Sequence, residues 1–348
     1  MSIIFFDGFD FYNSAGFGPG GRKWDQGSGG LVTGGRFGGQ GLLPSGGVTG
    51  GYSPTTKTFT SSSEVIVGFA MNVANFSGIN KPFLAFFDGT TPQCSLWVDP
   101  TTNTITVRQE LGQNLGDSTL GDSGFVPPLT LWFYIEVKMQ IGNPGSFQIN
   151  VAGTPQITVT GVQTQKSTNA STNKIALSSL QSFSTNISID DLYIIDTTDA
   201  TNNVDFLGEV RVQTQYPDAD GFENDFFPSV GTNNSANVNT TPTDYAEHGV
   251  YNYSGTVGAV DLYSIGNFTI SGTIFAVQEN LSFRKDDVGN RQIAPLLRTA
   301  STNYQGTSVP CYSTYTWAGK IWENNPNGNV PWDLVDLNIA QFGIDITS

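Results

Sequence analysis

Glycine density at the start of the chain constrains the fold most, because the first 51 residues hold seventeen of its 41 glycines. A helix cannot tolerate this density, since glycine loses the most chain entropy on folding. Apolar and aromatic residues interrupt the segment, whereas a flexible linker would combine glycine with serine alone. These residues are Phe5, Phe6, Phe9, Phe11, Tyr12, Phe17, Trp24, Leu31, Val32, Phe37, Leu42 and Leu43. We therefore predict tight loops and short strands packed on a sheet.

Composition restricts the function classes. Hydrophobic residues make up 38% and aromatic residues 12% of the chain, which excludes a disordered protein. Charged residues are only 13%, so Ser, Thr, Asn and Gln must form most of the polar surface. A polar surface of this composition is typical of β-proteins with extracellular surfaces. The net charge of −15, without any basic run, argues against nucleic acid and anionic membranes as partners.

The N-terminal residues do not predict export. Met1–Asp7 (MSIIFFD) lacks the basic region of a signal peptide and ends in an acid. No 18-residue apolar run is present, so we expect no membrane insertion. Synthesis in the cytoplasm with an exterior-type composition fits a component of a particle that is released by lysis.

Strand patterns follow one another through the first part of the chain. They cover residues 64–73, 82–87, 94–98, 104–109, 131–141, 146–151, 156–160, 174–177 and 187–195. Asp99–Asn103 (DPTTN) is a turn signal, so residues 94–109 should form a hairpin. Regularly spaced antiparallel strands predict a β-sandwich or jelly roll.

A second domain is expected after a polar linker. Residues 197–203 lack any large apolar side chain and separate a first domain, 1–196, from a second, 204–348. Strands are predicted at 205–213, 259–264, 271–284, 292–298, 313–321 and 341–347, with a hairpin turn at 286–290. Residues 331–340 predict one short helix, with Trp332, Val335 and Ile339 on its buried stripe. The predicted fold class is all-β: a jelly roll followed by a smaller antiparallel β-sandwich with one short helix.

Residues able to catalyse a reaction are scarce. His248 is the only histidine, lies in a polar loop and has no GxSxG elbow, which argues against a serine or cysteine triad and against most zinc sites. The glutamates are isolated, and Asp190 and Asp191 are adjacent, so a regular strand would point them to opposite faces. We therefore predict no catalytic residues and no enzyme.

Metal and redox chemistry find little support. Asp218-Ala219-Asp220-Gly221 resembles the start of a calcium loop. An EF-hand, however, has glycine at its sixth position and glutamate at its twelfth, where this chain has Glu223 and Ser229. Asp218 and Asp220 are thus weak metal candidates; no cofactor is predicted, and a structural calcium ion stays open. Cys94 and Cys311 fall in different predicted domains, so we expect two buried thiols and no disulfide.

Several short motifs resemble one protein family in their order. Phe6–Asp10 (FDGFD), Lys23–Asp25 (KWD), Gly35–Leu42 (GRFGGQGL) and Ile189–Ile194 (IDDLYI) resemble concanavalin-A-like (laminin-G-like) jelly rolls of tailed-bacteriophage virion proteins. The second half resembles the C-terminal β-domain that follows this jelly roll in phage structural proteins. Its motifs are Asp205–Val212, Lys285–Asp287, Ile321–Pro326 and Gln341–Ile344.

The resemblance implies a structural role in a virion, and it supplies no catalytic residues. The expected partners are other virion proteins, further copies of the chain by analogy, and a glycan on the host surface. Trp24, Arg36 and Phe37 are the candidate ligand-binding residues, whereas Trp97 and Trp132 are expected in the core. We expect a tail-associated or adhesion module. A capsid decoration or head-fibre protein is the alternative, followed by a glycan depolymerase.

Overall fold

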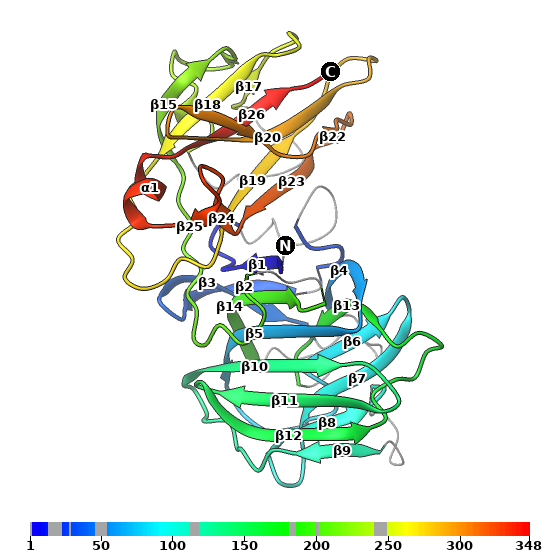
Figure 1. The fold of residues 1–348 in the computed structure, drawn as a ribbon. Helices are drawn as coiled ribbons and strands as arrows, with labels where there is room; N and C mark the ends of the chain where they lie inside the picture. The colour runs from blue at the N-terminus through cyan, green and yellow to red at the C-terminus, as the bar shows by residue number, and fades with distance from the viewer. Residues whose placement is uncertain are drawn as a thin grey trace. The chain divides into compact units, whose positions relative to one another are not determined.

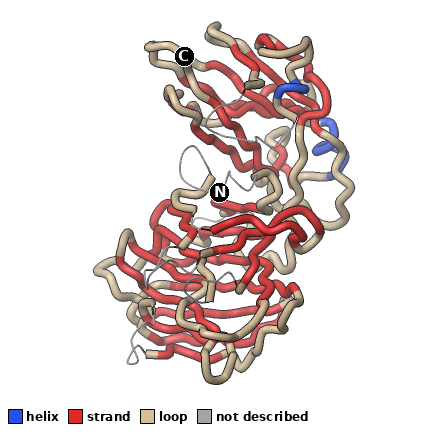
Figure 2. The backbone as a smooth tube through the Cα atoms, turned by 180° about the vertical axis from the view of Figure 1, so that it is seen from behind, coloured by secondary structure: helices blue, strands red, loops and turns tan. Residues whose placement is uncertain are grey.

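The chain forms two compact β-units. The computed structural model describes residues 2–12, 23–27, 29–45, 54–111, 118–180, 186–198, 202–239 and 249–348. Unit 1 comprises Met1–Pro19 and Trp24–Gln213, and unit 2 comprises Gly20–Lys23 and Thr214–Ser348. Strands account for almost all of the regular structure (Figures 1 and 2). The predicted all-β fold class is confirmed.

Unit 1 is a sandwich of two antiparallel sheets (Figure 1). The first sheet has the order β12-β11-β10-β5-β14-β3-β2, and β1 pairs with β14. Its strands are β1 (Ile3–Asp7), β2 (Gly29–Gly35), β3 (Gly38–Pro44), β5 (Glu64–Val73), β10 (Trp132–Gln140), β11 (Gly145–Val151), β12 (Thr154–Val162) and β14 (Ile187–Asp196). The second sheet has the order β4-β13-β6-β7-β8-β9. Its strands are β4 (Thr55–Ser62), β6 (Leu84–Asp88), β7 (Thr91–Val98), β8 (Ile105–Gln109), β9 (Thr119–Asp122) and β13 (Thr172–Leu177).

Alternation along the strands builds the core between these sheets. On β10, Phe133, Ile135, Val137 and Met139 join the core, while the intervening residues face the outer side of the first sheet. Strand β5 matches its predicted bounds, and β7 and β8 form the predicted hairpin, with Trp97 opposite Thr106. Trp97 is buried and Trp132 half-buried.

Unit 2 places a strand pair against a larger sheet. The larger sheet has the order β15-β18-β26-β20-β21, with β22 beside β20. It contains β15 (Pro217–Asn224), β18 (Val260–Ile265), β20 (Gln292–Thr299), β21 (Thr302–Gln305), β22 (Val309–Pro310) and β26 (Gln341–Ile346). The pair of β19 (Val277–Phe283) and β23 (Thr316–Trp322) contributes Phe283 and Ala318 to a core shared with Ile293 and Ile346 of the sheet. Short pairs join β16 (Phe227–Pro228) to β17 (Asn252–Tyr253) and β24 (Asn324–Asn325) to β25 (Val330–Pro331).

The short helix exists, but its buried side differs from the predicted one. Helix α1 covers Leu334–Ile339, and the Asp333 carboxylate caps it by accepting the Asp336 N–H at 2.7 Å. Trp332 and Leu337 are buried, as expected for the former, whereas Val335 and Ile339 are 71% and 65% exposed. A helix of six residues has too few turns for the predicted stripe, so only its middle contacts the core.

Two further sequence predictions for the second half are wrong. The turn after residue 284 does not close a hairpin, because β19 pairs with β23 and β20 pairs with β26. Residues 205–213 form no strand, and they belong to unit 1, which ends at Gln213. The main part of the second compact unit therefore begins at Thr214, whereas the sequence predicted Val204.

Cysteine placement agrees with the sequence prediction. Cys94 and Cys311 are buried free thiols, one in each unit. Among the described residues, no helix has the length and apolarity needed to cross a membrane.

Gly68 gives a direct test of the packing on the outer side of the first sheet. The Tyr193 ring lies against Gly68, and a β-carbon there would overlap the ring. We predict that Gly68→Ala lowers the free energy of unfolding by about 1–3 kcal/mol, measured by denaturant titration. Gly30→Ala is the control, because no atom lies within 4 Å of its β-carbon position, and its effect should stay within about 0.5 kcal/mol. Equal effects of the two substitutions would contradict this packing.

Candidate functional site

A β-bulge in β14 places two carboxylates on one side of the first sheet. Asp190 pairs with Ala70, and Tyr193 pairs with Gly68. The two residues Asp191 and Leu192 therefore lie opposite the single residue Phe69 on β5. Asp191 has a φ of 50°, in the left-handed region. The prediction that Asp190 and Asp191 point to opposite faces is therefore wrong, because the bulge adds a residue to the alternation.

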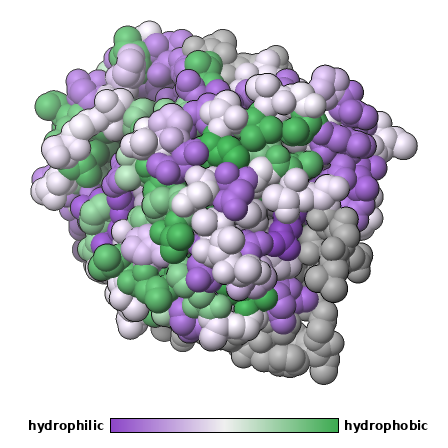
Figure 3. All heavy atoms as spheres, turned by 90° about the horizontal axis from the view of Figure 1, so that it is seen from below, coloured by the Kyte–Doolittle hydropathy of each residue, from purple (hydrophilic) through white to green (hydrophobic). Residues whose placement is uncertain are grey.

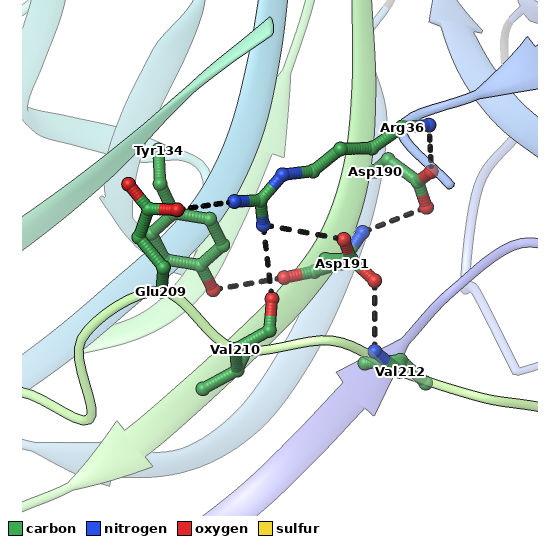
Figure 4. Close-up of polar contacts among 7 residues, drawn as sticks. All are labelled: Arg36, Tyr134, Asp190, Asp191, Glu209, Val210 and Val212. Carbon is green, nitrogen blue, oxygen red and sulfur yellow. Dashed lines mark hydrogen bonds and ion pairs between the residues drawn. The ribbon is translucent and has the colours of Figure 1, made fainter. Parts of the chain in front are cut away.

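Arg36 lies at the centre of the polar contacts drawn in Figure 4. It occupies the turn between β2 and β3, and its backbone N–H donates to Asp190 Oδ2 at 2.7 Å. Its guanidinium pairs with Asp191 at 3.4 Å and with Glu209 at 2.5 Å, and it donates to the Val210 carbonyl at 3.0 Å. The guanidinium also lies 5.1 Å from the centre of the Tyr134 ring.

Residues 202–213, here called the covering segment, are held along the same side of the sheet. The Val212 N–H donates to Asp191 Oδ1 at 2.7 Å, and the Gly208 N–H donates to Glu136 Oε1 at 2.8 Å. Tyr193 donates its hydroxyl to the same Glu136 oxygen at 2.5 Å, and Lys138 pairs with Asp205 at 2.9 Å. The side chains that hold the segment come from β10, β14 and the β2–β3 turn. This connection therefore lies against the jelly roll and is not a free linker.

Buried carboxyl groups give the site its electrostatic character. Burial, followed by the neighbouring charge of Asp191, raises the pKa of Asp190 to about 7. Burial raises the pKa of Asp191 to about 6, against the opposing effects of the Val212 N–H and Arg36. Burial also raises the pKa of Glu136 above its usual range. Burial therefore disfavours the charged form of all three carboxyl groups.

The Asp190–Asp191 pair is engaged by the protein itself. Asp190 accepts the N–H groups of Asp191 and Arg36, one on each oxygen. Asp191 accepts the Val212 N–H on one oxygen and pairs with Arg36 through the other. An acid–base pair for hydrolysis needs carboxyl oxygens that face substrate. This arrangement of Asp190, Asp191 and Arg36, here called the clamp, instead binds the covering segment to the sheet.

Glycine permits the close approach of backbone and carboxylates around this clamp. A β-carbon at Gly35 would lie 2.6 Å from Asp190 Oδ2, and one at Gly8 would lie 2.8 Å from the Val212 carbonyl oxygen. Part of the glycine density of the opening segment thus has a local cause.

The three predicted ligand residues have different environments. Trp24 is buried, and its Nε1 donates to Asp7 at 2.8 Å, so its ring cannot stack on a sugar. Arg36 is occupied by the clamp. Phe37 is 55% exposed, and the guanidinium groups of Arg36 and Arg211 each lie 4.8 Å from its ring centre. Only Phe37 retains an open surface.

The remaining candidates are dispersed. Asp218 is exposed in unit 2, whereas Asp220 accepts the Ser235 N–H at 2.6 Å within a polar cluster. His248 lies outside the described residues. Among the described residues, no group of three or more His, Cys, Asp or Glu side chains could hold a metal ion.

Sequence reasoning missed the clamp, although the sequence contains a signal for it. The buried apolar positions of β14 are Ile187, Ile189, Leu192 and Ile194. Their spacing changes from two to three between Ile189 and Leu192, which is the mark of one extra residue in the strand. The partners Arg36 and Glu209 are distant in sequence and gave no such signal.

Comparison with known proteins identifies no family for this chain. No protein-family model matches it, and no curated protein matches it in sequence. Among solved structures, it is similar to domain 4 of AbnA, a GH43 extracellular arabinanase from Geobacillus stearothermophilus, with 16% identity and a TM-score of 0.36 over 54% of this chain and 87% of that chain. An endo-β-1,4-glucuronan lyase from Trichoderma reesei gives 15% identity and a TM-score of 0.39 over 56% and 96%. Galectin LEC-6 from Caenorhabditis elegans is 8% identical, with a TM-score of 0.29 over 41% of this chain and 90% of that chain. Similarities at these TM-scores assign neither a family nor an activity.

The raised pKa of Asp190 predicts a pH-dependent difference between wild type and Asp190→Asn. The folded state binds this proton more tightly than the unfolded chain, so its contribution to stability is present at low pH and is lost as pH rises through about 7. Relative to Asp190→Asn, the wild type should gain stability as pH falls from about 8 to about 5, with a slope of at most about 1.4 kcal/mol per pH unit. Urea titrations at a series of pH values measure this difference. A flat difference between wild type and Asp190→Asn over this range would contradict the assignment.

Removal of the Arg36 side chain should weaken the attachment of the covering segment to the sheet. In Arg36→Ala, Asp191 and Glu209 lose their partner, so the amides of Gly208 and Val212 should exchange with deuterium on the order of tenfold faster or more. Exchange of peptides from residues 202–213, read by mass spectrometry, measures the effect. Arg108→Ala removes a comparable ion pair with Asp99 and should leave these peptides unchanged. A similar rise in both variants would indicate general destabilisation instead.

Proposed function

We propose that the protein is a non-enzymatic structural component on the surface of a tailed-phage particle, acting as a tail-associated or adhesion module. The observation that carries the non-enzymatic part is the clamp, in which the carboxyl oxygens of Asp190 and Asp191 bind the protein's own backbone and Arg36. The order of the family motifs supports the phage assignment.

A surface on unit 2 supports adhesion. Phe227 on β16 and Tyr253 on β17 are 62% and 53% exposed, and their ring centres lie 5.9 Å apart. Tyr251, which is 41% exposed, lies 6.2 Å from Tyr253. Exposed neighbouring aromatic rings are suited to stacking on sugar rings or to packing on a protein partner. On the face drawn in Figure 3, hydrophobic and hydrophilic residues are interspersed.

Capsid decoration is the second candidate function. The only α-helix among the described residues is α1, with six residues, so this part of the chain offers no helical shaft to extend from a particle. A protein bound flat on a shell needs no shaft. Position and copy number in intact particles, obtained by cryo-electron microscopy, separate the two: a few copies at the tail support the adhesin, and hundreds on the head support decoration.

The aromatic cluster predicts the result of a binding assay. We expect the purified chain to bind host cells and to block phage adsorption, and Phe227→Ala combined with Tyr253→Ala to weaken binding about tenfold or more. Tyr312→Ala is the matched control, because Tyr312 is 55% exposed and lies outside the cluster. Release of sugar from host polysaccharide, abolished by Asp190→Asn, would overturn the non-enzymatic proposal.

A further inference from the structure

The turn between β24 and β25 in unit 2 contains Asn327-Gly328, the only Asn-Gly pair in the sequence. The two short strands pair Asn325 with Val330, and residues 326–329 (PNGN) connect them. Both residues of the Asn-Gly pair are exposed. Solvent water therefore reaches the amide side chain and the peptide bond that follows it.

The backbone nitrogen of Gly328 is accessible. Gly328 has a φ of 84°, in the left-handed region, and a β-carbon there would have only Val330 Cγ1 within 4 Å, at 3.9 Å. Among the residues that the structure describes, none accepts a hydrogen bond from the Gly328 N–H. Glycine also allows the close approach of a neighbouring group to the backbone. Neither a side chain nor a hydrogen-bond partner protects this nitrogen.

The side-chain amide of Asn327 has a single hydrogen bond, and that bond acts on its oxygen. The Tyr304 hydroxyl donates to Asn327 Oδ1 at 3.4 Å. In the described part of the chain, no group accepts a hydrogen bond from Asn327 Nδ2. By contrast, the neighbouring Asn325 is buried, its Nδ2 donates to Asp336 Oδ2 at 2.8 Å, and its Oδ1 accepts the Asn327 N–H at 3.0 Å. Asn327 thus has an unbound amino group and a carbonyl that the tyrosine polarises.

We propose that Asn327 is a site of spontaneous deamidation, assisted by the Tyr304 hydroxyl. The Gly328 nitrogen attacks Cγ of Asn327 and gives its proton to water, and Nδ2 leaves as ammonia. A five-membered succinimide results. Water then opens the ring at either carbonyl, which gives aspartate or isoaspartate, so the only co-reactant is water.

The tyrosine contributes at the step that forms the ring. Negative charge develops on Asn327 Oδ1 as the nitrogen attacks, and a hydroxyl directed at that oxygen stabilises the charge. Tyr304 lies on β21 and packs against the core of unit 2, so the fold holds it in place. This inference does not depend on the proposed function.

The modified turn would weaken the position of the following segment. Isoaspartate adds one methylene group to the backbone and a carboxylate to the side, whereas β24 and β25 pair through only two residues each. Residue Trp332 follows β25 directly, and its Nε1 donates to the Trp322 carbonyl at 2.9 Å in the core. We therefore expect faster deuterium exchange of peptides from residues 324–340 in the isoaspartate form.

Peptide mapping of the full chain tests the site. The protein is incubated in mildly alkaline buffer made with isotopically labelled water, and fragmentation by mass spectrometry locates aspartate and isoaspartate. Asn327 should convert first and incorporate label from the water that opens the ring. Conversion at Asn327 no faster than at Asn324 or Asn329 of the same hairpin would overturn the proposal.

Two variants separate the parts of the mechanism. Gly328→Asn should slow the conversion of Asn327 about tenfold or more, because the added side chain hinders ring closure while asparagine tolerates the left-handed region. Gly153→Asn is the control in another turn: its φ is 72°, no atom lies within 4 Å of its β-carbon position, and the rate at Asn327 should stay the same. Equal rates in the two variants would contradict the attack by Gly328.

Tyr304→Phe tests the contribution of the fold. Loss of the hydroxyl should slow conversion in the folded protein about two- to tenfold, the equivalent of one hydrogen bond. In concentrated urea, where Tyr304 no longer lies beside Asn327, the variant and the wild type should convert at the same rate. An unchanged rate in the folded variant, or a difference that persists in urea, would refute the role of Tyr304.

Discussion

The jelly roll depends on how two adjacent carboxylates are neutralised in a buried position. Asp190 and Asp191 lie on one side of the sheet because β14 contains a bulge, and two like charges there would strongly disfavour folding if left unpaired. Arg36 and three backbone N–H groups supply the compensation. Since one of those groups is the Val212 N–H, neutralisation of the pair also fixes the path of the chain after the last strand of unit 1.

The same constraint explains the glycine-rich opening. Arg36 reaches the pair from a two-residue turn between Gly35 and Gly38, which pair across the hairpin. A side chain at Gly35 would occupy the position of the Asp190 carboxylate, and one at Gly8 would displace the Val212 carbonyl. Phe5, Phe9, Tyr12 and Trp24 belong to the core. The buried Asp7 carboxylate accepts hydrogen bonds from Trp24, Tyr12 and the Phe9 N–H. The described residues of this segment are therefore a packed part of the sandwich, as its aromatic content predicts.

Local patterns predicted the strands well because alternation and burial act over a few residues. Strand β5 and the β7–β8 hairpin follow directly from such patterns. The strand pairing in unit 2 could not be predicted from local patterns. The turn signal after residue 284 predicts that β19 pairs with β20, whereas β19 pairs with β23. Asp205–Gln213 alternates like a strand, yet its N–H groups bind Glu136 and Asp191 side chains instead of a neighbouring strand. Both errors concern contacts between residues that are distant in sequence. Such contacts cannot be predicted from the spacing of apolar residues along one strand.

The scarcity of cations in the chain connects the buried acids of the two units. With 15 lysines and arginines against 30 aspartates and glutamates, few buried carboxylates can have a basic partner. Unit 1 uses Arg36 for one pair and N–H or hydroxyl donors for Asp7 and Glu136. In unit 2, the Tyr263 hydroxyl and the side-chain amides of Asn234 and Asn252 donate to Asp261. Since neutral N–H and O–H donors offset the cost of burial only in part, the pKa of Asp261 is raised to about 6.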